Sequence, residues 1–151
     1  MLDDLDRRIL RYMQGDPDTS IPDLADRIGM TASRLSRRLD KLRETGVMLG
    51  TRAVINWQAL GYAVEVSLRI TLDKTQPRAF DEFIEAARLI PEVVEIQTFL
   101  GQVDVRLSVI ARDMAHYQDI YREQILTLPH INDIEALMQV ARIKSDESLP
   151  I

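Results

Sequence analysis

The sequence predicts an α+β fold in two parts, a winged helix-turn-helix followed by a β-α-β-β-α-β domain of the ferredoxin-like kind. Apolar residues recur at helical spacing as far as Gly46 and alternate with polar residues from Tyr62 onward. The later segments then follow the order of a split βαβ unit. We therefore expect a winged domain over residues 1–55, a linker over 56–61 and a ferredoxin-like domain over 62–151.

Three short helices are expected in the first part. The first covers residues 4–14, and the second begins after Ser20, whose hydroxyl is a typical N-cap. The third runs from Thr31 to Gly46 and carries a leucine stripe (Leu35, Leu39 and Leu42). A connection of about three residues between the last two helices is typical of a helix-turn-helix. Residues 47–55, "VMLGTRAVI", then predict a short hairpin that would form a wing.

The second part begins where the period changes from helical to alternating. Even positions from Tyr62 to Leu72 are apolar, which predicts a half-buried strand. Two later strands meet at Gly101-Gln102, and this pair suits a two-residue type II′ hairpin. The expected order is strand 62–72, helix 77–90, strands 92–100 and 103–110, helix 113–128 and strand 131–143.

Composition excludes several classes of site. The chain has no cysteine and only two histidines, so disulfides, thiolate nucleophiles and cysteine-ligated metals are excluded. We expect no cofactor, no metal site and no catalytic residue. The absence of a membrane-spanning stretch and of a signal peptide, together with the lack of cysteine, predicts a cytoplasmic protein that does not contact membranes.

The distribution of charge is uneven. The formal net charge is −5, yet residues 27–52 contain seven basic and two acidic side chains. At 100° per residue, Arg34, Arg37, Arg38 and Lys41 fall within an arc of about 100° that has no acidic member. A solvated charged face is the alternative interpretation. Because the arc lies on the second helix of a helix-turn-helix in an otherwise acidic chain, we predict that it binds double-stranded DNA.

Each residue type in this region has a physical role in binding DNA. Lysine and arginine neutralise phosphates, and arginine also reads guanine in the major groove. Hydroxyl groups bond phosphates or base edges. The predicted DNA-binding residues are Thr31, Ser33, Arg34, Ser36, Arg37, Arg38 and Lys41 of the helix, and Arg52 of the wing.

Four stretches in this order carry a resemblance: "LDDLDRRIL", "LADRIGMTASRLSRRLDKLRETGV", "IPEVVEIQTFLGQVDV" and "LTLPHINDIEALMQVARIK". Through them the chain resembles the leucine-responsive/asparagine-responsive (Lrp/AsnC) family of transcriptional regulators over nearly its whole length. The resemblance implies sequence-specific binding to an operator and a dimer built by the ferredoxin-like domains. It also implies further assembly, often to octamers.

The resemblance further implies that an amino-acid effector binds between subunits, near the Gly-x-x-Asp hairpin. The implied effector-binding residues are Gly101, Gln102, Val103 and Asp104. Main-chain amides of the hairpin can hold a carboxylate, and Asp104 can pair with an ammonium group. Val103 stands where many members of the family have an aromatic residue, which predicts a roomier pocket that can take a bulkier or sulfur-containing side chain.

Two other functions are alternatives to regulation by DNA binding. Relatives with this two-domain architecture decarboxylate sirohaem, a reaction that relies on histidines and arginines in a pocket. This chain has only His116 and His130, and its basic residues cluster on the predicted DNA-binding helix. A structural or co-regulatory assembly partner that does not itself bind DNA is the other alternative.

Overall fold

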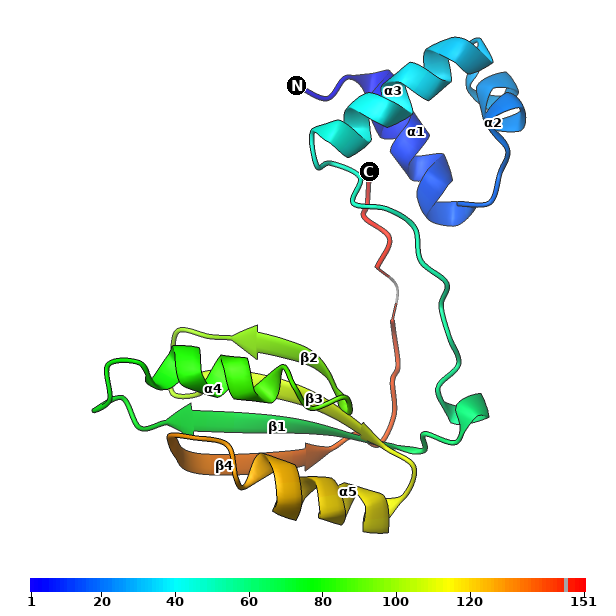
Figure 1. The fold of residues 1–151 in the computed structure, drawn as a ribbon. Coiled ribbons are helices and arrows are strands. Elements are labelled where there is room, and N and C mark those ends of the chain that lie inside the picture. The colour runs from blue at the N-terminus through cyan, green and yellow to red at the C-terminus, as the bar shows by residue number, and fades with distance from the viewer. Residues whose placement is uncertain (146) are drawn as a thin grey trace. The chain divides into compact units, whose positions relative to one another are not determined.

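Three helices, α1 (Asp4–Gly15), α2 (Ile21–Ile28) and α3 (Ala32–Glu44), form the first of two units in the computed structural model (Figure 1). The structure describes residues 1–145 and 147–151. The first unit comprises residues 1–54 and also residues 144–151, which the sequence assigns to the second domain. The second unit comprises residues 55–143.

Side-chain caps begin each of the three helices. Ser20 and Thr31 accept hydrogen bonds from the main-chain amides of Asp23 and Arg34, which confirms both predicted N-caps. Asp3 begins α1 in a reciprocal capping box with Asp6. The helices bury a common core of Ile9, Leu24, Ala25, Ile28, Leu35, Leu39 and Leu42.

The predicted wing hairpin is not formed. Residues 49–56 carry neither helix nor strand, although they follow the helix-turn-helix directly. Leu49 and Val54 are 95% and 93% exposed, so among the described residues these two side chains have almost no apolar contact. A two-stranded hairpin is marginal in water unless one of its faces packs on a core, and this segment has no such support.

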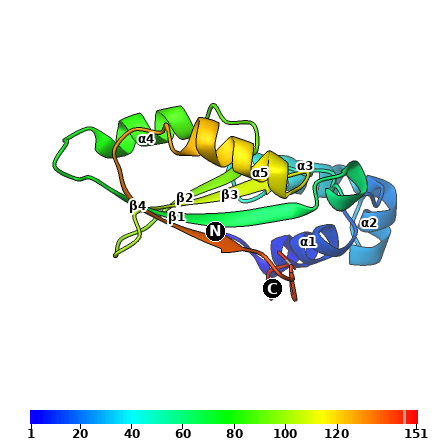
Figure 2. The same cartoon turned by 90° about the horizontal axis from the view of Figure 1, so that it is seen from below.

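The second unit is a four-stranded antiparallel sheet with two helices. Its strands are β1 (Val64–Leu72), β2 (Val93–Thr98), β3 (Val105–Ala111) and β4 (Ile131–Met138), in the order β2-β3-β1-β4. A single 3₁₀ turn (Gln58–Leu60) precedes β1, within the predicted linker. Helices α4 (Ala79–Ala87) and α5 (Met114–Ile120) lie on the same face of the sheet (Figure 2). This is the predicted β-α-β-β-α-β arrangement.

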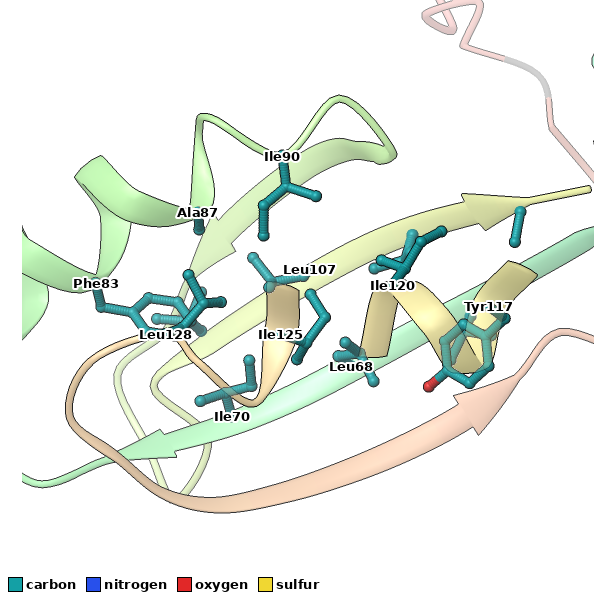
Figure 3. Packing of buried hydrophobic residues seen from close by; sticks show 14 of the residues in the cluster. Leu68, Ile70, Phe83, Ala87, Ile90, Leu107, Tyr117, Ile120, Ile125 and Leu128 are labelled. Carbon is teal, nitrogen blue, oxygen red and sulfur yellow. The ribbon is translucent and has the colours of Figure 1, made fainter. Parts of the chain in front are cut away.

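The core of this unit lies between the sheet and the two helices. The even positions Val66, Leu68, Ile70 and Leu72 of β1 are buried, as the alternation predicts. They pack with Leu107 of β3, Phe83 of α4 and Ile120 of α5, which point toward one another (Figure 3). The opposite face of the sheet carries no helix and is mixed in polarity.

The last strand ends at Met138 rather than at residue 143 as predicted, and two further details differ from the predicted elements. Helix α5 continues as a π-helical turn, η2 (Tyr121–Ile125), in which the Leu126 amide donates to the Tyr121 carbonyl at 2.9 Å. The connection between β2 and β3 is also longer than two residues. The Phe99 amide donates to the Asp104 carbonyl at 2.9 Å, so residues 100–103 form a four-residue loop.

Candidate nucleic-acid interface and ligand hairpin

Helix α3 is fixed to the first unit by its leucine stripe. Leu35, Leu39 and Leu42 are at most 2% exposed, so the opposite side of the helix faces solvent. Gly29 ends α2 in the left-handed region at φ 79°, where a residue without Cβ is favoured. The tight turn of residues 29–31 therefore presents α3 as the second helix of a helix-turn-helix.

Three of the predicted basic residues remain free on this helix. Arg34, Arg37 and Lys41 are exposed, and within residues 1–145 and 147–151 no carboxylate lies within 4.0 Å of their charged nitrogens. Ser33 is exposed beside them and Ser36 is half-buried. The Thr31 oxygen already accepts the Arg34 amide at 3.2 Å, which leaves the hydroxyl hydrogen to donate. The free cations give α3 a positive face in an acidic chain.

Arg38 has a different environment from the other three. Its Nη1 lies 2.8 Å from both carboxylate oxygens of Asp3 and 2.6 Å from Oδ1 of Asp6, and its side chain is 21% exposed. Among the four basic residues of the arc, Arg38 lies nearest the leucine stripe on the helical wheel, about 40° from Leu42. Arg38, one of the predicted DNA-binding residues, is therefore only partly exposed, because its side chain is turned toward the start of α1.

The pairing of Arg38 also affects the titration of its partners. The hydrogen bond from the Asp6 amide, followed by that from Arg38, holds the pKa of Asp3 below its ordinary value of 3.8. The same two aspartates raise the pKa of Arg38. The cluster thus favours the charged forms and joins α3 to the N-cap of α1.

Arg52 lies on the extended segment rather than on a wing. Its Nη2 is 3.5 Å from Oε1 of Glu147, and both side chains are more than four-fifths exposed. An ion pair this exposed contributes little to stability and is readily exchanged for another anion. Arg52 is therefore available to a phosphate, although the hairpin expected to carry it is missing.

The predicted ligand hairpin is the four-residue loop between β2 and β3. Thr71 of β1 donates from Oγ1 to the carbonyl of Gln102 at 3.0 Å, which ties the loop to the neighbouring strand. In the described part of the chain, the main-chain amides of residues 100–103 donate to no acceptor. Phe99 and Leu100, at the start of the loop, are exposed apolar side chains. The loop therefore offers free amides beside apolar surface.

Asp104 does not present its carboxylate to solvent. Its side chain is only 4% exposed, Oδ2 accepts the Leu72 amide at 2.9 Å, and Oδ1 lies 2.9 Å from Nζ of Lys74. The sequence predicts that this carboxylate pairs with the ammonium group of an effector. In the structure Leu72 at the end of β1 and Lys74 just beyond it are the partners, so Asp104 joins the end of β1 to the start of β3. Sequence reasoning missed Lys74 and Thr71, because their roles depend on the β1–β3 register.

Both histidines have partners within the second unit. Nδ1 of His116 accepts the Arg112 amide at 3.0 Å, and Nε2 of His130 lies 2.6 Å from Oε2 of Glu82. In residues 1–145 and 147–151, no three His, Asp or Glu side chains are arranged to hold a metal ion. None of the helices in these ranges has the length and apolar character that a bilayer crossing requires.

Two family profiles match the chain, and they divide it as the two units do in outline. "Winged helix-turn-helix DNA-binding" matches residues 2–47, and "Lrp/AsnC ligand binding domain" matches residues 65–149, more than half of the chain. The leucine-responsive regulatory protein of Haemophilus influenzae is 30% identical over 98% of this chain and 89% of its own.

Solved structures agree with these matches. An AsnC family transcriptional regulator from Agrobacterium tumefaciens has a TM-score of 0.89 and 31% identity, covering 99% of this chain and 97% of that one. A transcriptional regulator from Neisseria meningitidis, solved as a complex with L-Met, has a TM-score of 0.91 over the same shares. At 23% identity, that second likeness shows the fold alone.

Proposed function

Because the chain belongs to the Lrp/AsnC family of transcriptional regulators, we propose that it binds an operator sequence in DNA and is modulated by an amino acid bound between subunits. The observation that carries the proposal is the positive face of α3, which has no neutralising carboxylate in the described part of the chain. A cationic face on the second helix of a helix-turn-helix fits a phosphate backbone and a major groove.

The roles on DNA divide between free and paired residues. Arg34, Arg37 and Lys41 bind phosphates or guanine edges, and the hydroxyl groups of Thr31, Ser33 and Ser36 complete the interface. Arg52 exchanges Glu147 for a flanking phosphate. Arg38 instead positions α3 against α1 by binding two aspartates, and we assign it no contact with DNA.

The effector site uses the predicted hairpin, with a changed role for one residue. The amides of Gly101, Gln102 and Val103 hold the effector carboxylate, while Asp104 positions the loop through its bonds to β1. The side-chain carbonyl of exposed Gln102 is an acceptor for the ammonium group. Exposed Phe99 and Leu100 give the effector side chain apolar surface, and small Val103 leaves room for a bulky or sulfur-containing one.

Assembly into dimers, and then into larger rings such as octamers, uses the sheet of the second unit. On the face without helices, Arg69 and Arg106 are directly opposite on β1 and β3, and like charges so placed repel. The Nε of Arg106 is buried and has no hydrogen-bond partner among the described residues. A second copy that covers this face with its own acidic side chains would satisfy both arginines.

The single experiment that tests the proposal is a gel shift with the DNA upstream of the protein's own gene. We expect a shifted band that survives competitor DNA of unrelated sequence. No band, with a folded protein by circular dichroism, would contradict the DNA-binding function and favour the assembly partner. A thermal-shift screen of the twenty amino acids then tests the effector.

We propose no catalytic activity and a cytoplasmic site of action, since that is where a bacterial or archaeal operator is found. The chain's two histidines are held by main-chain and carboxylate partners, which leaves neither free to act in a propionate decarboxylation. Addition of sirohaem tests this point, and a Soret band that titrates with protein would contradict it.

A further inference from the structure

Residues 149–151 lie on helix α1 of the first unit. The side chain of Gln14 binds the main chain of Leu149 at two points. Its Oε1 accepts the Leu149 amide at 2.5 Å, and its Nε2 donates to the Leu149 carbonyl at 3.2 Å. Nearby, Nε of Arg11 donates to the main-chain oxygen of Ile151 at 2.5 Å. Residues 11 and 14 are three apart and share one helix face, so α1 offers a compact site for a main-chain segment.

The segment that occupies this site is suited to it. Pro150 has a fixed φ and no amide hydrogen, and it biases Leu149 toward extended backbone. The Ile151 amide folds back to the Leu149 carbonyl at 2.8 Å, which closes a tight turn. A proline-restricted turn loses less conformational entropy on binding than a flexible tail would. The three residues therefore present their main chain to Gln14 and Arg11 at low entropic cost.

The same segment continues directly from the second unit. Strand β4 is an edge strand of the sheet and ends at Met138. Val140 and Ile143, which follow it, are more than nine-tenths exposed. Residues 55–63 make one covalent connection between β1 and the first unit, and residues 139–148 make a second when the tail is seated. Because the tail is tethered, even a weak site is occupied at a high effective concentration.

We propose that Leu149–Ile151 is a strap, and that its seat on Arg11 and Gln14 ties the helix-turn-helix unit to the edge strand of the sheet. The segment that occupies the site on Arg11 and Gln14 belongs to the same chain. A change at the end of β4 then reaches α1 through the strap rather than through residues 55–63 alone. The consequence for operator binding rests on the proposed function, whereas the seat itself does not.

The strap predicts how strongly the affinity for DNA depends on the spacing between the two half-sites of the operator. A two-fold dimer reads two half-sites whose separation is set by the distance between its recognition helices. Two connections per subunit restrict that distance more than a single connection does. A released strap lowers affinity for the native spacing and relaxes the penalty for an altered spacing.

Hydrogen exchange of the full-length protein tests the seat without DNA. We expect the Leu149 amide to be protected in the wild type and to exchange roughly five- to tenfold faster in Gln14→Ala. Gln14→Glu keeps the acceptor and removes only the donor, so its effect is smaller. Arg8→Ala changes an exposed arginine of the same helix, removes neither hydrogen bond and leaves the exchange rate unchanged.

Two results would overturn the strap. One is a wild-type Leu149 amide that exchanges at the rate of an unstructured peptide. The other is protection that disappears on dilution, because the tail would then be seated on another copy.

A gel shift with the two half-sites moved apart by a few base pairs tests the consequence. We expect Gln14→Ala and Arg11→Ala to bind the native spacing severalfold more weakly and to discriminate less against the altered one. Arg8→Ala is the control for charge. Equal discrimination in the wild type and all three variants would refute the coupling even if the seat is real. Failure of every protein to bind DNA would refute the proposed function and leave the exchange result standing.

Discussion

The two candidate sites treat their charges in opposite ways. On α3, Arg34, Arg37 and Lys41 have no anionic partner in the part of the chain that the structure describes. At the hairpin, the carboxylate of Asp104 is buried and bound by Leu72 and Lys74. Both sets of residues look equally functional in the sequence. An exposed charge without a partner indicates a ligand outside the chain, whereas a buried and paired charge indicates a structural role.

Arg38 shows that the distinction operates within one helix. It shares an arc with three free cations, yet it is turned toward Asp3 and Asp6 at the start of α1. Its position next to the leucine stripe brings it within reach of those aspartates. The following predictions test whether free and paired charges differ as the structure indicates.

The largest effect is expected for the free arginines. Arg34→Ala combined with Arg37→Ala removes two cations from the positive face, at about 1–3 kcal/mol of DNA-binding free energy each if they read bases. The slope of log affinity against log salt concentration falls by about one for each phosphate that the protein no longer neutralises. Titrations at several salt concentrations measure both quantities.

Arg43→Ala is the matched control for this pair. Arg43 lies on the other side of α3 and is bound to Asp40 of the same helix at 3.3 Å. Affinity and salt slope are expected to stay near wild type. If Arg43→Ala weakened binding as much as the double variant, the interface would lie elsewhere on the unit.

The next largest effect is expected at Asp104, on stability. Asp104→Ala leaves the buried Leu72 amide without an acceptor, which costs about 1–3 kcal/mol in the free energy of unfolding. Asp104→Asn keeps an acceptor and removes only the charge opposite Lys74, so it costs less. Urea denaturation measures both. A fully stable Asp104→Ala that no longer responds to an effector would restore the role predicted from sequence.

A smaller effect is expected at Arg38. Arg38→Ala removes one guanidinium from two partly exposed carboxylates, which we expect to cost about 1 kcal/mol of stability. Affinity for DNA falls slightly because α3 is held less firmly, but the salt slope stays unchanged. A slope reduced by one would show that Arg38 does bind a phosphate. Arg38→Lys keeps the positive charge but lacks the planar guanidinium with its several donors, so it is expected to lose less stability than Arg38→Ala.

The smallest effect is a dependence on acid pH. The pKa of Asp3 and of Glu82 is lowered in the folded chain, by hydrogen bonds from the Asp6 amide and from His130 respectively. A lowered folded pKa stabilises the protein above the ordinary values of 3.8 and 4.5, and this contribution is lost as the pH falls through the folded values. Thermal melts between pH 6 and about pH 3 are expected to show the loss. Asp3→Asn flattens the profile only if Asp3 contributes as described.

Local patterns predicted most of the fold but only part of the sites. Ser20, Thr31 and the alternating residues of β1 act through neighbours a few positions away, so periodicity and capping rules identify them. Asp3 with Arg38, and Asp104 with Lys74, are joined only when helices pack or strands pair. The predicted wing hairpin is absent for a related reason, since residues 47–55 have the composition of a hairpin but Leu49 and Val54 are almost fully exposed and pack on no core.

The π-helical turn after α5 has a consequence for insertions and deletions. In a continuous α-helix, Ile125 would lie about 80° around the axis from Tyr117, toward the edge of the core. The wider turn over Tyr121–Ile125 returns Ile125 to full burial, and Leu128 follows it into the core. After a one-residue deletion here Tyr117 and Ile125 would be seven residues apart, so a relative lacking one residue would keep both side chains on one face of a continuous α-helix. The π turn thus accommodates one extra residue without changing which side chains face the core, and for such a relative a one-residue alignment gap belongs within Tyr121–Ile125, where it keeps Ile125 and Leu128 aligned with core positions.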